Sequence, residues 1–438
     1  MKRILYILVD IIIIYGCILF TFFLLDRNQV LTEFQRNFEA FKIIYPFIGL
    51  FYLILMYAFG LYDLMRKELF ELFYTVFLVS ISLTIGIMGI CFFVRDIALA
   101  FPRSVILLSA LFYFVLLSAW RFLLWFLDIK FHGVKRVIIF GEDNSRLVDT
   151  ITNRYAHFYK IEGIYNSVEP SIKEKIQSID GIFVCADVLQ KIRQELLPLC
   201  IKYRKEFFYI PKYFDLSIKS STLLKIDDIP TFRIPIYGLS PEENFVKRLS
   251  DIFLGLLASI FFLPFAVIIA MFIKLDGGPV FYHQERLTKD GKTFKIYKFR
   301  TMIPDAEKLS GPVLAGDNDD RITKVGRFLR IVRLDEIPQL INILKGDMSI
   351  VGPRPERPFF TLQFEKKIPE YSYRLRVKAG LTGLAQVEGK YNSTVENKLR
   401  YDLIYINNYS VLRDLLIMLQ TVKILFMKSS TDGVNTNT

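Results

Sequence analysis

Apolar residues concentrate in four long runs near the start of the chain. The runs are 4–25, 43–62, 72–94 and 105–127. Only Asp10 in the first run and Arg121 in the last interrupt them with a charge. Each run is close to the ~20 residues that a helix needs to cross the hydrocarbon of a bilayer. The pattern predicts a four-helix transmembrane domain over residues 1–128, in which Arg121 lies close enough to one end of its helix to snorkel.

Short apolar runs then alternate with helical stretches up to about residue 240. Strands are expected at 136–141, 160–165, 181–186 and 206–211. Alternation of this kind predicts a Rossmann-like α/β domain over 129–240. The first strand-to-helix turn, Gly141-Glu-Asp-Asn-Ser, lacks the GxGxxG pattern, and its two acidic residues would repel a pyrophosphate. We therefore expect a scaffolding, dimerisation or regulatory role for this domain rather than dinucleotide binding.

A fifth apolar segment, 252–273, contains no charge but has Pro264 near its middle. Proline removes a backbone donor and clashes with the preceding turn, so a kink is expected. Each limb would then be roughly 15–18 Å long, too short to span a bilayer alone. Basic residues flank the segment on both sides, which favours a re-entrant helix at about 251–275 with both ends cytoplasmic. An ordinary fifth crossing is the alternative, and it would place everything after residue 275 outside the cell.

The composition fits a membrane protein with a basic surface. Of 438 residues, 53% are hydrophobic, and 56 Lys and Arg against 44 Asp and Glu give a net charge of +12. These values exclude a disordered chain, a collagen and a small disulfide scaffold. Residues 281–410 alone hold 23 Lys and Arg against 16 Asp and Glu. Acidic residues beside these cations, and the membrane segment before them, argue against nucleic acid as the partner.

A basic stretch leads to a pair of carboxylates. Between 321 and 333 the cations recur mostly every third residue, which predicts a basic helical stripe, and Asp335 and Glu336 follow. A helix closed at Gly346 is expected next. Asp335 would lie at or near its N-cap, where the positive end of the helix dipole would keep it ionised and nucleophilic. An isolated Asp-Glu pair is more simply a helix cap, so its surroundings decide between the two interpretations.

Further cations surround the pair. Arg354 stands between two prolines that restrict its backbone, so its planar guanidinium can be presented to phosphate oxygens at little ordering cost. The strand-like segment 295–302 puts Lys298 and Arg300 on one face, which also suits a phosphate. A carboxylate among such cations is typical of a site where a carboxylate attacks phosphorus, with Mg²⁺ and Arg screening the phosphate charge.

The chain from about 245 to 430 resembles the bacterial sugar transferase family, the monotopic polyprenyl-phosphate phosphoglycosyl transferases, in six ordered blocks. They are Gln284-Glu-Arg286, Lys298-Phe-Arg-Thr-Met302, 321–330 (RITKVGRFLR), Leu334-Asp-Glu-Ile-Pro-Gln-Leu340, 346–355 (GDMSIVGPRP) and Leu381-Thr-Gly-Leu-Ala-Gln386. The four-helix front and the α/β insert resemble the long form of that family, which starts exopolysaccharide, capsule and O-antigen assembly. The catalytic domain would span 241–430, with the re-entrant helix broken at Pro264.

The resemblance implies transfer of a sugar 1-phosphate from a UDP-sugar to undecaprenyl phosphate, with release of UMP. Asp335 would be the nucleophile that forms a phosphosugar–aspartyl intermediate, and Glu336 would bind Mg²⁺. The phosphate contacts carried over are Arg354, Arg357, Arg330, Lys298 and Arg300. The chain departs from common family usage at Asp320, where proline is frequent, and at Leu384, where tryptophan is frequent. The second departure puts the donor preference in doubt.

The resemblance also implies a setting: the bacterial inner membrane, with the catalytic domain on its cytoplasmic face among membrane lipids. A homodimer and downstream glycosyltransferases are the expected protein partners. The run 410–427 is amphipathic and would either lie along the interface or pack on the catalytic domain, and 431–438 is expected to be a disordered tail. The alternative is a regulatory or scaffolding protein of polysaccharide export. It would explain the membrane half but not the cluster around Asp335.

Overall fold

The structure, a computed structural model, describes residues 2–25, 31–61, 69–93, 102–234, 238–303, 319, 321–389 and 393–425. These residues form two compact units, 1–211 and 212–438, and each is described by itself. Asp320 and the tail 431–438 lie outside the described residues. The expected boundaries between three domains stay predictions.

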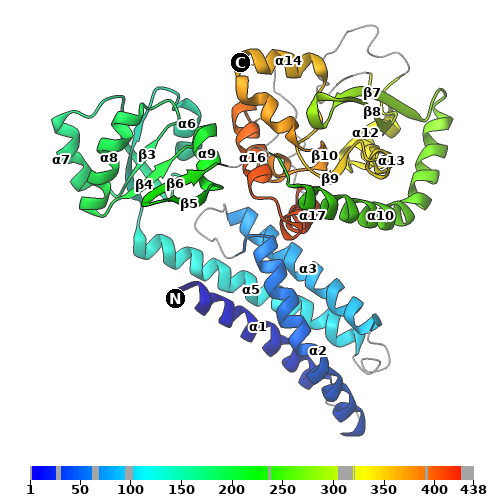
Figure 1. The fold of residues 1–438 in the computed structure, drawn as a ribbon. Helices are drawn as coiled ribbons and strands as arrows, with labels where there is room; N and C mark the ends of the chain where they lie inside the picture. The colour runs from blue at the N-terminus through cyan, green and yellow to red at the C-terminus, as the bar shows by residue number, and fades with distance from the viewer. Residues whose placement is uncertain are drawn as a thin grey trace. The chain divides into compact units, whose positions relative to one another are not determined.

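Long apolar helices occupy the first part of unit 1 (Figure 1). They are α1 (Lys2–Leu25), α2 (Leu31–Ala58), α3 (Leu69–Phe93) and α5 (Arg103–His132). Each contains most of one predicted apolar run, and each is long and apolar enough to cross a membrane. α1 packs against α5, α5 against α3, and α3 against α2.

The prediction that Arg121 snorkels to a helix end is wrong. Its side chain is 1% exposed and forms an ion pair with Asp10 of α1, which is also buried. The Tyr52 hydroxyl of α2 donates a hydrogen bond of 2.8 Å to Oδ2 of the same carboxylate. A buried charge is tolerated when it is paired and hydrogen-bonded, so this cluster ties α1, α2 and α5 together.

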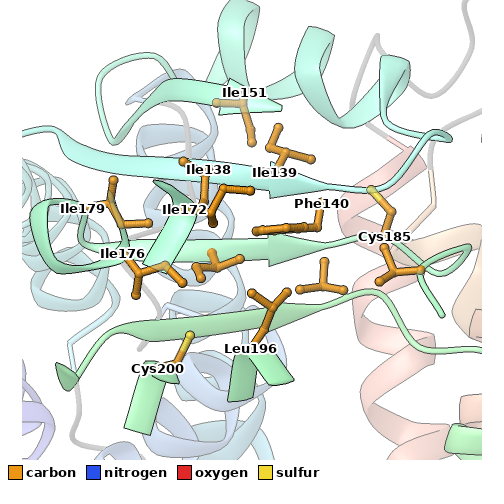
Figure 2. Close-up of a cluster of buried hydrophobic side chains, with 13 residues drawn as sticks. Ile138, Ile139, Phe140, Ile151, Ile172, Ile176, Ile179, Cys185, Leu196 and Cys200 are labelled. Atoms are coloured by element: carbon orange, nitrogen blue, oxygen red, sulfur yellow. The ribbon is translucent and has the colours of Figure 1, made fainter. Parts of the chain in front are cut away.

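The second part of unit 1 is a four-stranded parallel sheet in the order β2-β1-β3-β4. Its strands are β1 (Lys135–Phe140), β2 (Tyr159–Tyr165), β3 (Gly181–Val184) and β4 (Glu206–Tyr209), so all four predicted strands are confirmed. The connecting helices are α6 (Ser145–Arg154), α7 (Pro170–Ser178) and α8 (Gln190–Tyr203). Figure 2 shows the core, in which Ile138, Ile139 and Phe140 of β1 are fully buried with Leu196 and Cys200 of α8. Strands buried on both faces are expected to be this uniformly apolar.

Unit 2 begins with a helix and a hairpin that the sequence patterns did not predict. Helix α9 (Tyr213–Lys219) packs against α16 (Val395–Asn407) through its buried Leu216. The antiparallel hairpin β5 (Thr222–Ile226) and β6 (Ile229–Arg233) follows it.

The fifth apolar segment lies in α10 (Pro241–Leu275), a 35-residue helix that contains Pro264. A reciprocal capping box between Ser240 and Glu243 begins the helix 11 residues before the predicted segment. Figure 1 shows α10 bending into two limbs. Both limbs pack on unit 2: Gly255 lies against Leu344, and the second limb adds its buried Ile269 and Ile273 to another cluster.

The remaining α-helices and strands of unit 2 are each shorter than α10. They are β7 (Phe281–Leu287), β8 (Thr293–Phe299), α12 (Lys324–Ile331), α13 (Gln339–Lys345), β9 (Ser349–Val351), α14 (Pro358–Lys367), β10 (Gly380–Thr382), α15 (Leu384–Val387), α16 and α17 (Val411–Leu425). β7 pairs antiparallel with β8, and β9 pairs parallel with β10. α17 packs on this unit, because Ile417 is buried and Thr421 shares a hydrogen bond with Thr382.

The buried ion pair between helices makes a stability prediction. Asp10→Asn or Arg121→Met alone is expected to cost about 3–5 kcal/mol, because each leaves a buried polar group without its partner. The double variant is expected to regain most of that loss. SDS-induced unfolding in mixed micelles measures it, and a double variant that loses the sum of both single losses would contradict the pairing.

Candidate active site

Two cations converge on one carboxylate oxygen in unit 2. Nζ of Lys298 lies 2.5 Å from Oε1 of Glu336, and Nη2 of Arg354 lies 3.1 Å from the same oxygen. The Glu336 side chain is 16% exposed, whereas that of Arg354 is 44% exposed. The guanidinium is therefore anchored at one end and open to a ligand.

Strand β8 holds Lys298 in place relative to the carboxylates. The strand pairs with β7 along its whole length. Asn342 of α13, which is fully buried, accepts a hydrogen bond from the Tyr297 N–H at 3.0 Å and donates to the Lys295 carbonyl at 2.8 Å. One side chain thus fixes α13, which follows the acidic pair directly, against the strand that carries Lys298.

Asp335 and Glu336 lie in a 3₁₀ turn, Leu334–Glu336, that precedes α13. We expect Asp335 at or near the N-cap of the following helix. The structure places it three residues before the cap, because α13 begins at Gln339 with Pro338 at the capping position. The predicted end of that helix is confirmed at Gly346, whose φ of 93° suits glycine.

The two neighbouring carboxyl groups have opposite pKa shifts. Burial alone would raise the pKa of Glu336, but Lys298 and Arg354 outweigh it and lower that pKa. Burial and the charge of Glu336 raise the pKa of Asp335, and Lys298, Arg330 and Arg354 offset part of that rise. The expectation that a helix dipole keeps Asp335 ionised stays a prediction. Paired carboxyls whose pKa values are pushed apart are typical of sites that give them different roles.

The other predicted phosphate contacts lie in different surroundings. Arg300 is 6% exposed and donates a hydrogen bond to the Ile273 carbonyl near the end of α10. Arg330 donates through Nε to the Thr301 hydroxyl and contributes charge at Asp335. Arg357 lies over the Phe360 ring. The structure thus brings Lys298 and Arg354 to the acidic pair, and the substrate roles of all five cations stay predictions.

The sequence patterns missed one cation of the site. Burial lowers the pKa of Arg333, which interacts electrostatically with Arg354, Glu336 and Asp335. The sequence spacing predicts Arg333 as the last cation of a helical stripe. In the structure α12 ends at Ile331, and Arg333 has a left-handed φ of 55°. Its position two residues before Asp335 was the available signal.

The acidic pair fits a Mg²⁺ ion that is shared with a substrate. Within the described ranges, no three His, Cys, Asp or Glu side chains are grouped closely enough to hold a metal by themselves. Mg²⁺ in phosphoryl-transfer sites is usually bound by one or two carboxylates together with substrate phosphates. Asp335 and Glu336 offer that number of carboxylates.

Comparison with known proteins places this site in a family. Residues 242–428 match the model of the bacterial sugar transferases. The chain is 40% identical over 322 residues to the UDP-glucose:undecaprenyl-phosphate glucose-1-phosphate transferase of Escherichia coli K12, an alignment that covers 67% of this chain and 68% of that protein. This chain belongs to the bacterial sugar transferase family.

Two other proteins match shorter parts of the chain. A UDP-N-acetylgalactosamine-undecaprenyl-phosphate N-acetylgalactosaminephosphotransferase of Aeromonas hydrophila is 40% identical over 222 residues, 49% of this chain and 52% of its own length. An exopolysaccharide production protein of Rhizobium leguminosarum is 40% identical over 186 residues, 40% of this chain and 93% of its own length. The chain therefore spans about half the length of the Aeromonas relative and nearly all of the Rhizobium one.

In the α/β part of this sugar transferase, the side chain of Asp187 lies at the first strand-to-helix turn. The Asp187 carboxylate accepts hydrogen bonds from the backbone N–H groups of Glu142 at 2.6 Å and Asp143 at 3.3 Å. A Cβ on Gly141 would clash with the same side chain at 2.7 Å. In dinucleotide-binding domains such N–H groups face a pyrophosphate, so here the chain itself satisfies them.

Asn342 yields a stability prediction for the site. Asn342→Leu removes the hydrogen-bond partner of the half-buried Tyr297 N–H and of the Lys295 carbonyl, at about 1 kcal/mol for each bond. We expect a lower thermal unfolding temperature in detergent than for the matched control Ile341→Ala, whose side chain is exposed. An Asn342→Leu protein as stable as that control would contradict the bridging role.

Proposed function

We propose that this protein transfers a sugar 1-phosphate from a UDP-sugar to undecaprenyl phosphate, giving undecaprenyl-diphosphate-sugar and UMP. The observation that carries the proposal is the Asp335–Glu336 pair held by Lys298 and Arg354 within the family-matched region. The names of the relatives support both substrates. Because those relatives use glucose in one case and N-acetylgalactosamine in another, the sugar is left open.

Asp335 is the nucleophile in this proposal. Its carboxylate forms a bond to the β-phosphorus of the UDP-sugar, the bond from that phosphorus to the bridging oxygen breaks, and UMP leaves. A phosphate oxygen of undecaprenyl phosphate then attacks the same phosphorus and releases Asp335. The raised pKa supports this role, because a more basic carboxylate is a better nucleophile once it is ionised.

The cations lower the electrostatic barrier to this attack. A carboxylate that approaches a diphosphate faces like charges, and fixed cations in a poorly hydrated site offset that repulsion. Arg354, with its open guanidinium, is the strongest candidate for the donor phosphates, together with Lys298. Arg357, Arg330 and Arg300 remain proposed phosphate contacts of lower rank, since each has another contact in the fold.

Glu336 is the proposed Mg²⁺ ligand. Both of its cation contacts end on Oε1, and its carboxylate would hold the ion together with donor phosphates. When bound, Mg²⁺ would screen the diphosphate charge and stabilise the leaving UMP. Without the metal, Lys298 and Arg354 keep Glu336 ionised by lowering its pKa.

The membrane arrangement belongs to the same proposal. α1, α2, α3 and α5 would form a four-helix bundle that crosses the bacterial inner membrane, and α10 would be re-entrant, with unit 2 on the cytoplasmic face. Both limbs of α10 pack on unit 2, which supports a re-entrant helix. A helix that crossed the bilayer would have one end on the opposite side, out of contact with unit 2. The sheet of unit 1 would be a Rossmann-like domain without a nucleotide. We also propose that the protein is a homodimer and that downstream glycosyltransferases use its product as their substrate.

A scaffolding or regulatory protein is the weaker alternative. Such a protein would have no need for a partly buried carboxylate pair with divergent pKa values. Family membership favours a transferase as well.

Asp335 gives the direct test of activity. With UDP-sugars, Mg²⁺ and undecaprenyl phosphate, the detergent-purified protein is expected to release UMP. Asp335→Asn is expected to lower that rate by roughly 10³-fold or more, because an amide is not a nucleophile at phosphorus. The matched control Asp290→Asn, at an exposed left-handed turn that Asn tolerates, is expected to keep full activity. No UMP from any donor, or undiminished release from Asp335→Asn, would refute the proposal.

The pKa shift at Asp335 predicts the pH dependence. Since the nucleophile must be ionised, UMP release is retained above its raised pKa and is lost as pH falls through it. Lys298→Met removes a cation that lowers this pKa, so the acid limb of the residual activity should move up by roughly one pH unit. Lys295→Met, exposed on the same strand, is the control. A limb that stays in place or moves down in Lys298→Met would contradict the assignment.

A further inference from the structure

The backbone that carries Arg354 is held by a second arginine. Arg374, in the 3₁₀ segment Pro369–Arg376, donates through Nη2 to the Arg354 carbonyl at 2.9 Å. Arg374 is 5% exposed, although the Arg354 side chain is 44% exposed. The backbone of Arg354, whose own guanidinium is exposed, is therefore held in place by the buried guanidinium of Arg374.

Two buried partners orient Arg374 in turn. Its Nε lies 2.9 Å and its Nη2 2.8 Å from Oδ2 of Asp402 in α16, and its Nη1 donates to the Tyr371 hydroxyl at 2.6 Å. Asp402 and Tyr371 are 2% and 3% exposed. The planar fork of arginine satisfies all three acceptors at once, which the single ammonium of lysine cannot do in the same plane.

The neighbouring carbonyls of the segment are held in the same way. Nη1 of Arg286 donates to the Pro355 carbonyl at 3.1 Å, and the Leu287 N–H donates to the Glu356 carbonyl at 3.0 Å. Three successive carbonyls, from 354 to 356, thus have partners outside the segment. The Arg354 side chain is the part of its residue left to adjust, and it reaches Glu336.

We propose that Arg374, oriented by Asp402 and Tyr371, is a positioning residue that sets where Arg354 meets the phosphates of the donor. The inference rests on the proposed function, in which Arg354 contacts the donor diphosphate. Arg374 itself touches no substrate: it acts through the Arg354 carbonyl. Buried, fully hydrogen-bonded support of this kind is how active sites hold a reactive geometry, and a displacement of about 1 Å can cost roughly 100-fold in rate.

A double-variant cycle separates positioning from simple support of the fold. We expect Arg374→Lys to lower kcat/KM for UMP release by roughly 100-fold in the natural protein. In the Arg354→Met background the same change should cost less than about three-fold, because the group it positions is already gone. A loss of equal size in both backgrounds would overturn the proposal, since general damage to the fold does not depend on the Arg354 side chain.

Two further measurements keep the test decisive. The dissociation constant for UDP, measured on the same four proteins, should show the same non-additivity and needs no turnover. Asp402→Asn, which keeps the shape of the side chain, should repeat the Arg374→Lys pattern if the lysine variant does not fold. Arg376→Lys, an exposed arginine on the same segment, is the control and should change neither quantity.

The outcomes distinguish this inference from the proposed function. A wild-type protein that releases no UMP but binds UDP would refute the function, and the UDP cycle would still test Arg374. A wild-type protein that does neither overturns both. Normal wild-type activity with additive losses overturns the positioning role alone.

Discussion

The convergence of Lys298 and Arg354 on one oxygen of Glu336 is the contact on which the catalytic region depends. It joins a strand, a proline-flanked segment and a 3₁₀ turn that are far apart in sequence. Removal of one partner would leave a partly buried charge less compensated. The same contact keeps Glu336 ionised, and the charge of Glu336 helps to raise the pKa of Asp335. One electrostatic arrangement thereby gives two adjacent carboxyl groups opposite pKa shifts.

Helix α10 connects this arrangement to the apolar part of unit 2. On its first limb, Arg248 donates to the Ile343 and Leu344 carbonyls at 2.6 and 2.7 Å, at the end of α13 where a cation is favourable. At its far end, the Ile273 carbonyl accepts from Arg300, which directly follows the strand of Lys298. Helix α10 is thus hydrogen-bonded both to the end of α13 and to Arg300, the residue after β8.

The sequence predicted what depends on local pattern. Apolar runs and strand–helix alternation located the long helices and strands β1–β4. The charges around Asp335 pointed to Lys298 and Arg354, which meet at Glu336. What it missed depends on distant partners. Arg121 was expected to snorkel because its sequence neighbours do not reveal Asp10, 111 residues away. The rise in the Asp335 pKa depends chiefly on burial, which is set only when the chain has folded. Asn342 and Arg374 have no pattern in the sequence, since their roles exist only once α13, β8 and α16 have come together.

The central claim is that the phosphosugar becomes covalently bound to Asp335 and not to Glu336, which is paired with two cations. Brief incubation with a labelled UDP-sugar and Mg²⁺ without lipid acceptor, followed by acid quench, proteolysis and mass spectrometry, tests it directly. The account predicts the mass of one phosphosugar on the peptide that contains Asp335, its loss on addition of undecaprenyl phosphate, and its absence from Asp335→Asn. Stoichiometric UMP release with no adduct, or an adduct on Glu336 or elsewhere, would contradict it.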